Sequence, residues 1–204
     1  MWPRDSIMKK LLLSAAMVIF AISQPVFADD IDPFDAARQG NIDVLTQFVQ
    51  NGGDVEARNR RGHTPFILAT YYGQTKAAEA LKHEGADPCA TDSQGSPAFM
   101  GVVFKGHADT LEWLLENTRC DVNHQNYAGQ TALMLAALFD RTEIAETLIK
   151  AGAKPEIADH RGNTPESLAV GQGLQKMIKI LKFHRETNKA KPSKIPHEKI
   201  KYAR

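Results

Sequence analysis

The sequence lacks the short motifs that mark the commonest catalytic and nucleotide-binding sites. Its 204 residues contain no P-loop, no Gly-x-Ser-x-Gly nucleophile turn, no His-Glu-x-x-His pair and no glycine-rich dinucleotide loop. The seven histidines are scattered, and no two of them stand four residues apart, as a helical zinc site would require. We therefore expect a protein that is not an enzyme and that binds neither a metal nor a cofactor.

An excess of charge of one sign is also missing, because the formal net charge of the chain is only +1. Residues 29–183 carry 15 Lys and Arg against 21 Asp and Glu, a net charge of −6, whereas residues 184–204 carry 7 against 2, a net charge of +5. Nucleic-acid binding needs a basic surface, so the acidic body argues against DNA or RNA as the main partner. We interpret the basic segment 184–204 as a disordered tail; contact with anionic lipid or an acidic partner is the alternative.

No apolar run is long enough to cross a membrane, which takes roughly 20 consecutive apolar residues. The apolar stretch 11–22 follows two lysines and ends at a Ser-Gln-Pro break, and small residues precede Ala28. This layout is typical of a cleavable secretory signal peptide. We predict a signal peptide over residues 1–28, a periplasmic location and no transmembrane anchor in the mature chain; the start codon could encode Met1 or Met8.

What the sequence does contain is a repeated pattern of turns and helix breaks. Turn glycines stand at Gly62, Gly95, Gly129 and Gly162, so the pattern has a period of about 33 residues. A break between two helices follows eleven positions after each of them, at Gly73, Gly106, Asp140 and Gly173. A unit of one turn and two helices cannot bury its apolar side alone, so such units stack into a solenoid. Counting back one period predicts a degenerate first copy that begins at Asp29.

These motifs resemble those of the ankyrin repeat family. The turn and helix start read GHTPFILA from Gly62 and GQTALMLAA from Gly129, and a closing Gly-Ala-Asp stands at residues 85–87. The resemblance covers residue 29 to about residue 182. It implies an all-α solenoid of about five helix-turn-helix repeats with short β-turn fingers. We predict repeats over residues 29–61, 62–94, 95–128, 129–161 and 162–183, and a chain that is monomeric when free.

The third copy departs most from the family pattern. Pro97 stands where the family has Thr, and Gly101 lies inside the first helix, where Gly costs about 1 kcal/mol relative to Ala. We expect the solenoid to be softest there. Trp113, at a family Leu position, is interpreted as a core residue.

Cysteine is scarce, and both cysteines lie in the segments that close neighbouring copies. Cys89 and Cys120 could form a disulfide in an oxidising compartment. The bond needs Cα atoms closer than about 7 Å, whereas packed helices stand about 10 Å apart. The two residues are not at equivalent positions, and that offset could close the gap or widen it.

The resemblance also indicates where a partner would bind. Variable positions of the family lie on the turn tips and on the two residues before each helix break, facing the concave side. Here the helix positions are Tyr71, Tyr72, Phe104, Lys105, Leu138 and Phe139, and the turn tips add Arg58, Arg60, Arg61, His63, Tyr127, His160 and Arg161. We predict an aromatic floor with a cationic rim, suited to a partner loop or helix that carries carboxylates. The alternative is that some of these side chains fold onto the helix pair, or pack under a neighbouring turn, and serve only stability.

The predicted function is therefore non-catalytic binding of an unidentified protein. Small exported proteins of this family suggest two settings: an inhibitor or immunity protein against a periplasmic enzyme or toxin, or an accessory factor of catalase and oxidative-stress defence. Carriage of haem or another small ligand by Tyr71, Tyr72 or a histidine is a further alternative. The scaffold fixes a shape and leaves the ligand to surface residues, so the sequence does not name the partner.

Overall fold

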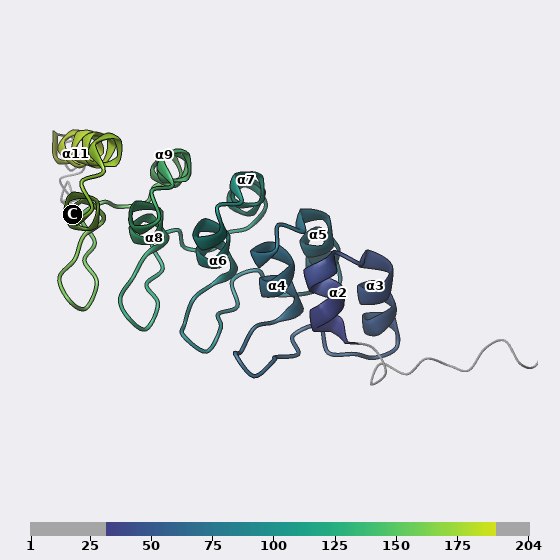
Figure 1. Cartoon of the computed structure of the whole chain (residues 1–204). Helices are drawn as coiled ribbons and strands as arrows, with labels where there is room; N and C mark the ends of the chain where they lie inside the picture. The colour runs from purple at the N-terminus through teal and green to yellow at the C-terminus, as the bar shows by residue number, and fades with distance from the viewer. Residues whose placement is uncertain (1–31, 191–204) are drawn as a thin grey trace, which may run out of the picture.

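The structure, a computed structural model, describes residues 32–190. The described residues form ten α-helices arranged as five antiparallel pairs that stack side by side into an elongated array (Figure 1). The helices are α2 (Pro33–Gln39), α3 (Ile42–Gln50), α4 (Pro65–Tyr71), α5 (Thr75–His83), α6 (Ala98–Lys105), α7 (Ala108–Asn117), α8 (Ala132–Leu138), α9 (Thr142–Lys150), α10 (Pro165–Gly171) and α11 (Gln175–Ala190). The predicted all-α solenoid is confirmed over this part of the chain. The predicted signal peptide lies outside the described residues.

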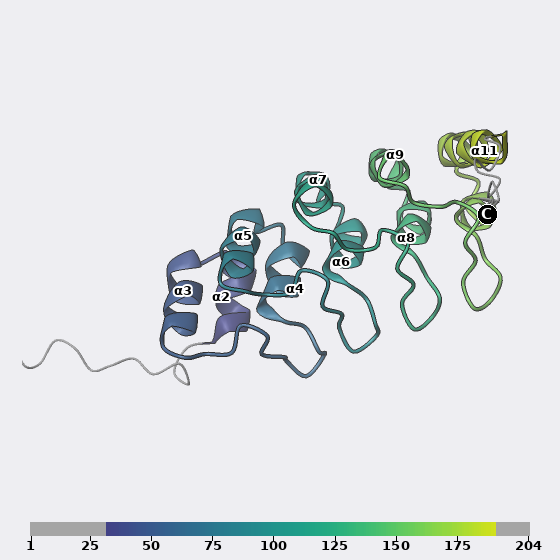
Figure 2. The ribbon, with the colours of Figure 1, turned by 180° about the vertical axis from the view of Figure 1, so that it is seen from behind.

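The helices form two rows, with the fingers on one side of them. α2, α4, α6, α8 and α10 make an inner row, and α3, α5, α7, α9 and α11 make an outer row (Figures 1 and 2). The chain leaves each of the first four outer helices and enters the next inner helix through a long loop, the finger, which projects beyond the inner row. No helix among residues 32–190 is both long enough and apolar enough to span a bilayer.

Each finger is built on an Asx turn and joined to its neighbour. Asn59, Asp92, Asn126 and Asp159 accept backbone N–H bonds from residues two and four positions further on. They recur with the same spacing as the turn glycines, each standing three positions before one of them. One backbone bond then links successive fingers, from the N–H groups of Ser93, Tyr127 and His160 to the carbonyls of Arg61, Gln94 and Ala128.

The inner helices start on a side-chain cap in every repeat except the third. The hydroxyl of Thr64 accepts from the Ile67 N–H at 3.2 Å, and Thr131 and Thr164 cap α8 and α10 in the same way. α6 begins after Pro97 and α7 after His107, and neither residue makes a side-chain cap bond. The third pair is thus the only described pair with no side-chain N-cap on either helix.

The core is continuous along the stack. The inner helices bury large side chains such as Phe66, Met100 and Leu133, and the outer helices bury Leu111 and Leu148. The predicted core residue Trp113 lies half-buried, with its ring 6.5 Å from that of Phe66. Each pair hides its apolar side only against its neighbours, as a stacked-repeat architecture requires.

Cys89 and Cys120 form a disulfide, with their Cα atoms 5.3 Å apart. The offset between their positions therefore closes the gap that the sequence left undecided. The bond ties the segment after α5 to the segment after α7, on either side of the uncapped third pair.

The boundary predicted at residue 183 is wrong, because α11 continues to Ala190. The extra turns carry Arg185, whose Nη1 lies 2.6 Å from the Glu166 carboxylate. Glu166 holds the position that Leu133 holds in the preceding repeat, where the side chain is buried under the next pair. Residues 184–190 thus form part of the carboxyl-terminal cap, and the tail predicted beyond them lies outside the described residues.

Candidate partner-binding groove

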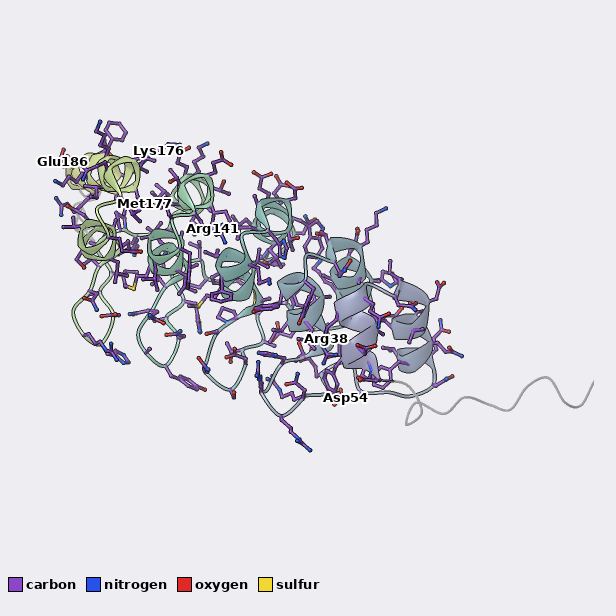
Figure 3. All side chains as sticks on the ribbon, viewed as in Figure 1. Arg38, Asp54, Arg141, Lys176, Met177 and Glu186 are labelled. Carbon is purple, nitrogen blue, oxygen red and sulfur yellow. A yellow bond between two sulfur atoms is a disulfide. The ribbon has the colours of Figure 1, made fainter. Side chains whose placement is uncertain are left out.

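A groove of about 920 Å³ runs in the angle between the fingers and the inner row. Its floor comes from α4, α6 and α8, and its wall comes from the second, third and fourth copies' turn segments, at residues 59–63, 92–97 and 126–130. Figure 3 shows the side chains of the fingers and inner helices that meet along this side of the array, with Arg38 of α2 at one end. Six of the thirteen residues predicted from the family resemblance line the groove, namely Tyr71, Tyr72, Phe104, Arg60, Arg61 and His63, whereas Lys105, Leu138 and Phe139 are not among the lining residues.

Four aromatic rings form a row along the floor and its continuation. Tyr72 and Tyr71 meet edge to face with ring centroids 5.3 Å apart, Tyr71 and Phe104 stack at 6.2 Å, and Phe104 and Phe139 meet edge to face at 4.9 Å. Edge-to-face and offset-stacked contacts are the arrangements that aromatic quadrupoles favour. Three repeats thus contribute to one connected surface, which we call the aromatic row.

The aromatic row is open to solvent along most of its length. Tyr72 is 44% exposed, Phe104 43% and Phe139 38%. Tyr71 is half-buried, as is Leu138 at the end of α8. The rings of Tyr72, Phe104 and Phe139 are therefore accessible to a partner, while each also packs against its neighbours along the row.

The charged side chains that line the groove are mostly cationic, and one of them, Arg38, pairs with Asp35 of its own helix, with its Nη1 3.1 Å from the Asp35 Oδ1. Arg38, Arg60 and Arg61 line it, and Lys105 places its Nζ 5.4 Å from the centroid of the Tyr71 ring. Asp92 is the one acidic residue among those that line the groove, and its carboxylate is committed to the Asx turn of its own finger. The net charge of the residues that line the groove is therefore positive, whereas the net charge of the body of the chain is negative.

His63 lies beside Asp92 with its Nε2 3.7 Å from the Asp92 Oδ2. Burial of the imidazole lowers the pKa of His63 from its ordinary value of 6.5; the Asp92 carboxylate opposes this shift and the Arg61 guanidinium adds to it. His63 is thus held largely neutral near pH 7, and its predicted role as part of a cationic rim does not follow from this geometry.

Four of the seven predicted turn-tip residues do not line the groove: Tyr127, His160, Arg161 and Arg58. Tyr127 is 74% exposed, and its ring covers Gly95 of the preceding finger. His160 covers Gly129 in the same manner and donates its backbone N–H to the Ala128 carbonyl. Together with Arg161 these residues lie outside the residues that line the groove, and Tyr127 and His160 brace neighbouring fingers.

Arg58 likewise supports the fingers. Its Nη1 donates to the carbonyls of Gly62 and Thr91, at 2.9 and 2.6 Å, and so joins two successive turns.

Arg38 is a groove residue that the sequence reasoning missed. It stands two residues before Gly40, the helix break of the first copy. Tyr71 and Phe104 were selected because they stand two residues before a helix break, and the same criterion applied to the degenerate first copy would have selected Arg38. Gly101 was also missed, because a residue without a side chain carries no binding chemistry of its own.

Comparison with known proteins identifies the repeats. Residues 34–126 and 99–192 match the family model for ankyrin repeats in three copies. The chain is 28% identical over 184 residues to the ankyrin repeat protein YahD of Escherichia coli (strain K12), an alignment that covers 72% of this chain and 92% of YahD. It is 30% identical over 154 residues to the human SH3 and multiple ankyrin repeat domains protein 2, covering 75% of this chain and 8% of that protein.

A further relative is the NF-kappa-B inhibitor alpha of Sus scrofa, 36% identical over 109 residues that span 50% of this chain and 34% of that protein. The chain therefore spans only a small part of the human and porcine relatives, whereas it spans nearly all of YahD.

Proposed function

The chain belongs to the ankyrin repeat family, and from that premise we propose that it is a periplasmic module that holds one partner protein in the groove between its fingers and inner helices. Ankyrin repeats are protein–protein interaction modules and are generally non-catalytic. The observation that carries the proposal is the aromatic row, which joins three repeats and is exposed at Tyr72, Phe104 and Phe139.

Exposed aromatic side chains that touch one another differ from single apolar residues scattered over a surface. Contiguous apolar patches on soluble proteins mark sites of interaction. Tyrosine and other aromatic residues are frequent anchors at such sites, because they bury much area and lose little conformational freedom. A partner that covered the aromatic row would remove these rings from water without reshaping the helices that hold them.

Charge narrows the kind of partner. Arg38, Arg60 and Arg61 line the same groove as Tyr71, Tyr72 and Phe104, and the Asp92 carboxylate accepts hydrogen bonds within its own finger. A partner segment with carboxylates beside an apolar or aromatic side chain would pair with both features. Electrostatic complementarity of this kind chiefly sets the association rate and the choice of partner.

The periplasmic location is supported by two independent features. The segment 1–28 has the basic, apolar and small-residue order of a signal peptide. Cys89 and Cys120 are paired in a disulfide, a bond that persists in oxidising compartments and is rare in the cytosol of mesophiles.

Within this function we favour an inhibitor or immunity role over an accessory role in oxidative-stress defence. This preference is supported by one relative, the porcine NF-kappa-B inhibitor alpha, which is named as an inhibitor of another protein. An inhibitor forms a tight complex of fixed stoichiometry with one enzyme or toxin and abolishes its activity. An accessory factor would instead bind weakly, and its deletion would sensitise the cell to peroxide.

The proposal is tested by replacing both ends of the aromatic row. The immobilised wild-type chain should capture one partner from periplasmic extract at a constant stoichiometry, and the variant Tyr72→Ala/Phe139→Ala should not capture it. The urea midpoint of the variant should equal that of the wild type within the error of the measurement. Phe183→Ala is the matched control, because Phe183 is also an exposed aromatic residue but lies on α11, away from the groove. A variant that keeps the partner and loses stability would assign the row to folding instead.

A further inference from the structure

Gly101 stands in the interior of α6 without a backbone reason to be glycine. Its φ is not among the positive values that occur at the turn and break glycines of this chain. Glycine inside a helix is unfavourable relative to alanine. The spacing that relates the turn glycines places Leu68, Leu135 and Leu168 at the equivalent positions of the second, fourth and fifth copies, and Asp35 in the degenerate first copy. The third repeat therefore lacks one side chain in a row of leucines.

The ring of Tyr71 occupies the space that this missing side chain leaves. A Cβ atom on Gly101 would lie 3.0 Å from the Tyr71 Cδ2, closer than the surrounding atoms tolerate without movement. Placed there, the Tyr71 ring lies within 17° of parallel to Phe104 and beneath the Lys105 ammonium group. The aromatic row passes from the second repeat to the third through this one contact.

We propose that Gly101 is the positioning residue of the groove, because its missing side chain lets Tyr71 lie against α6 and joins Tyr72 to Phe104 and Phe139 in one continuous floor. The inference rests on the proposed function, since it gives the groove its shape. A leucine at this position would push the ring into the groove and divide the floor. The groove then accepts a partner segment that lies flat across three repeats, and Gly101 selects for it without touching it.

A second glycine provides the matched control. Gly171 is the other described glycine within a helix that has no positive φ, and a Cβ built on it meets nothing within 4 Å. Gly171 lies at the end of α10, and no ring stands next to it. Gly171→Ala therefore measures the gain in stability that comes from replacing a helical glycine by alanine when no neighbour opposes the new methyl group.

The experiment is a double-mutant cycle with a structural readout on the purified chain. Gly171→Ala should raise the urea midpoint, whereas Gly101→Ala should leave it unchanged or lower it. In a Tyr71→Ala background, Gly101→Ala should raise the midpoint, because the ring that opposed the new methyl group is gone. In parallel, the nuclear Overhauser contacts between the Tyr71 and Phe104 rings should weaken strongly in Gly101→Leu, which restores the full side chain found at this position in other copies, and should persist in Gly171→Ala.

Equal gains from Gly101→Ala in both backgrounds, or ring contacts that survive unchanged in Gly101→Leu, would overturn the assignment. The ring contacts are measured in the single variant alone, so they decide the matter even where the Tyr71→Ala chain does not fold. No partner enters either measurement. Failure here would leave partner capture by the aromatic row untouched, and failure of partner capture would leave the position of Tyr71 established.

Discussion

His63 is the residue at which burial and charge compete inside the groove. Burial lowers its pKa below 6.5 and outweighs the opposing carboxylate of Asp92. The unfolded chain consequently binds more protons than the folded chain between the two pKa values, and stability rises with pH in that window. The stabilising contribution of neutral His63 is fully present above the unfolded pKa of 6.5 and is lost as the pH falls through the folded pKa.

We predict that unfolding by urea becomes easier between pH 7.5 and pH 5.5, and that His63→Gln makes this dependence shallower. The hydrogen bond from the Asn163 side chain holds the pKa of Asp159 below its ordinary value of 3.8, so titration of Asp159 contributes little in this interval. His83→Gln, which removes an exposed histidine from α5, is the control. An unchanged slope in His63→Gln would contradict the account.

At the scale of elements, the third helix pair depends on a covalent bond more than its neighbours do. α6 and α7 have no side-chain N-cap, and α6 contains Gly101. α7 ends at Thr118 without the positive-φ glycine that follows the caps of α5 and α9, at Gly85 and Gly152. The Cys89–Cys120 disulfide joins residues separated by 31 positions and so closes a loop around this pair. Such a bond stabilises chiefly by restricting the unfolded chain.

We predict that reduction by a dithiol, or the variant Cys89→Ser/Cys120→Ser, lowers the free energy of unfolding by about 2–4 kcal/mol. Hydrogen exchange followed by mass spectrometry should show amides of α6 and α7 exchanging faster, with α8 and α9, whose inner helix is capped by Thr131, changing less. A uniform change along the whole stack would show that the bond does not act on the third pair in particular.

Elements with a strong local signal were predictable from the sequence, and those that depend on a neighbour were not. The regular period, the Thr caps and the break glycines are short-range features, so the repeats and the aromatic positions followed from them. The disulfide depended on a small offset in space between two segments that are 31 positions apart in the sequence. The end of α11 depended on Arg185 reaching Glu166, and a tail rich in lysine gave no sign of it.

The same distinction holds for the groove. Tyr127 and His160 carry side chains suited to binding, yet each covers a glycine of the preceding finger. Gly101 carries no side chain, yet it makes room for Tyr71. Only the packing of one repeat on the next reveals either role.

Over the whole molecule, positive and negative charges are distributed unevenly. Residues 29–183 carry a net charge of −6, while the groove presents Arg38, Arg60 and Arg61. A partner attracted by the groove must approach an otherwise acidic protein. Long-range attraction between exposed charges is screened beyond about 10 Å at 0.1 M salt, so association should be sensitive to ionic strength.

We predict that Arg60→Gln/Arg61→Gln slows association with the partner severalfold at low salt and has a much smaller effect at about 0.5 M salt, while the dissociation rate changes little. Surface plasmon resonance over a salt series separates the two rates. Arg161→Gln, which removes an exposed cation from the last finger, is the matched control. An equal effect of this control would show that net charge alone, and not the groove, steers the partner.

The most direct test of the central claim is a hydrogen-exchange footprint of the chain with and without its bound partner. The groove account predicts slower exchange in the fingers around residues 59–63 and 92–97 and at the carboxyl-terminal ends of α4, α6 and α8, with the outer helices α5, α7 and α9 unchanged. Slower exchange confined to the outer helices, with no change at the aromatic row, would contradict it.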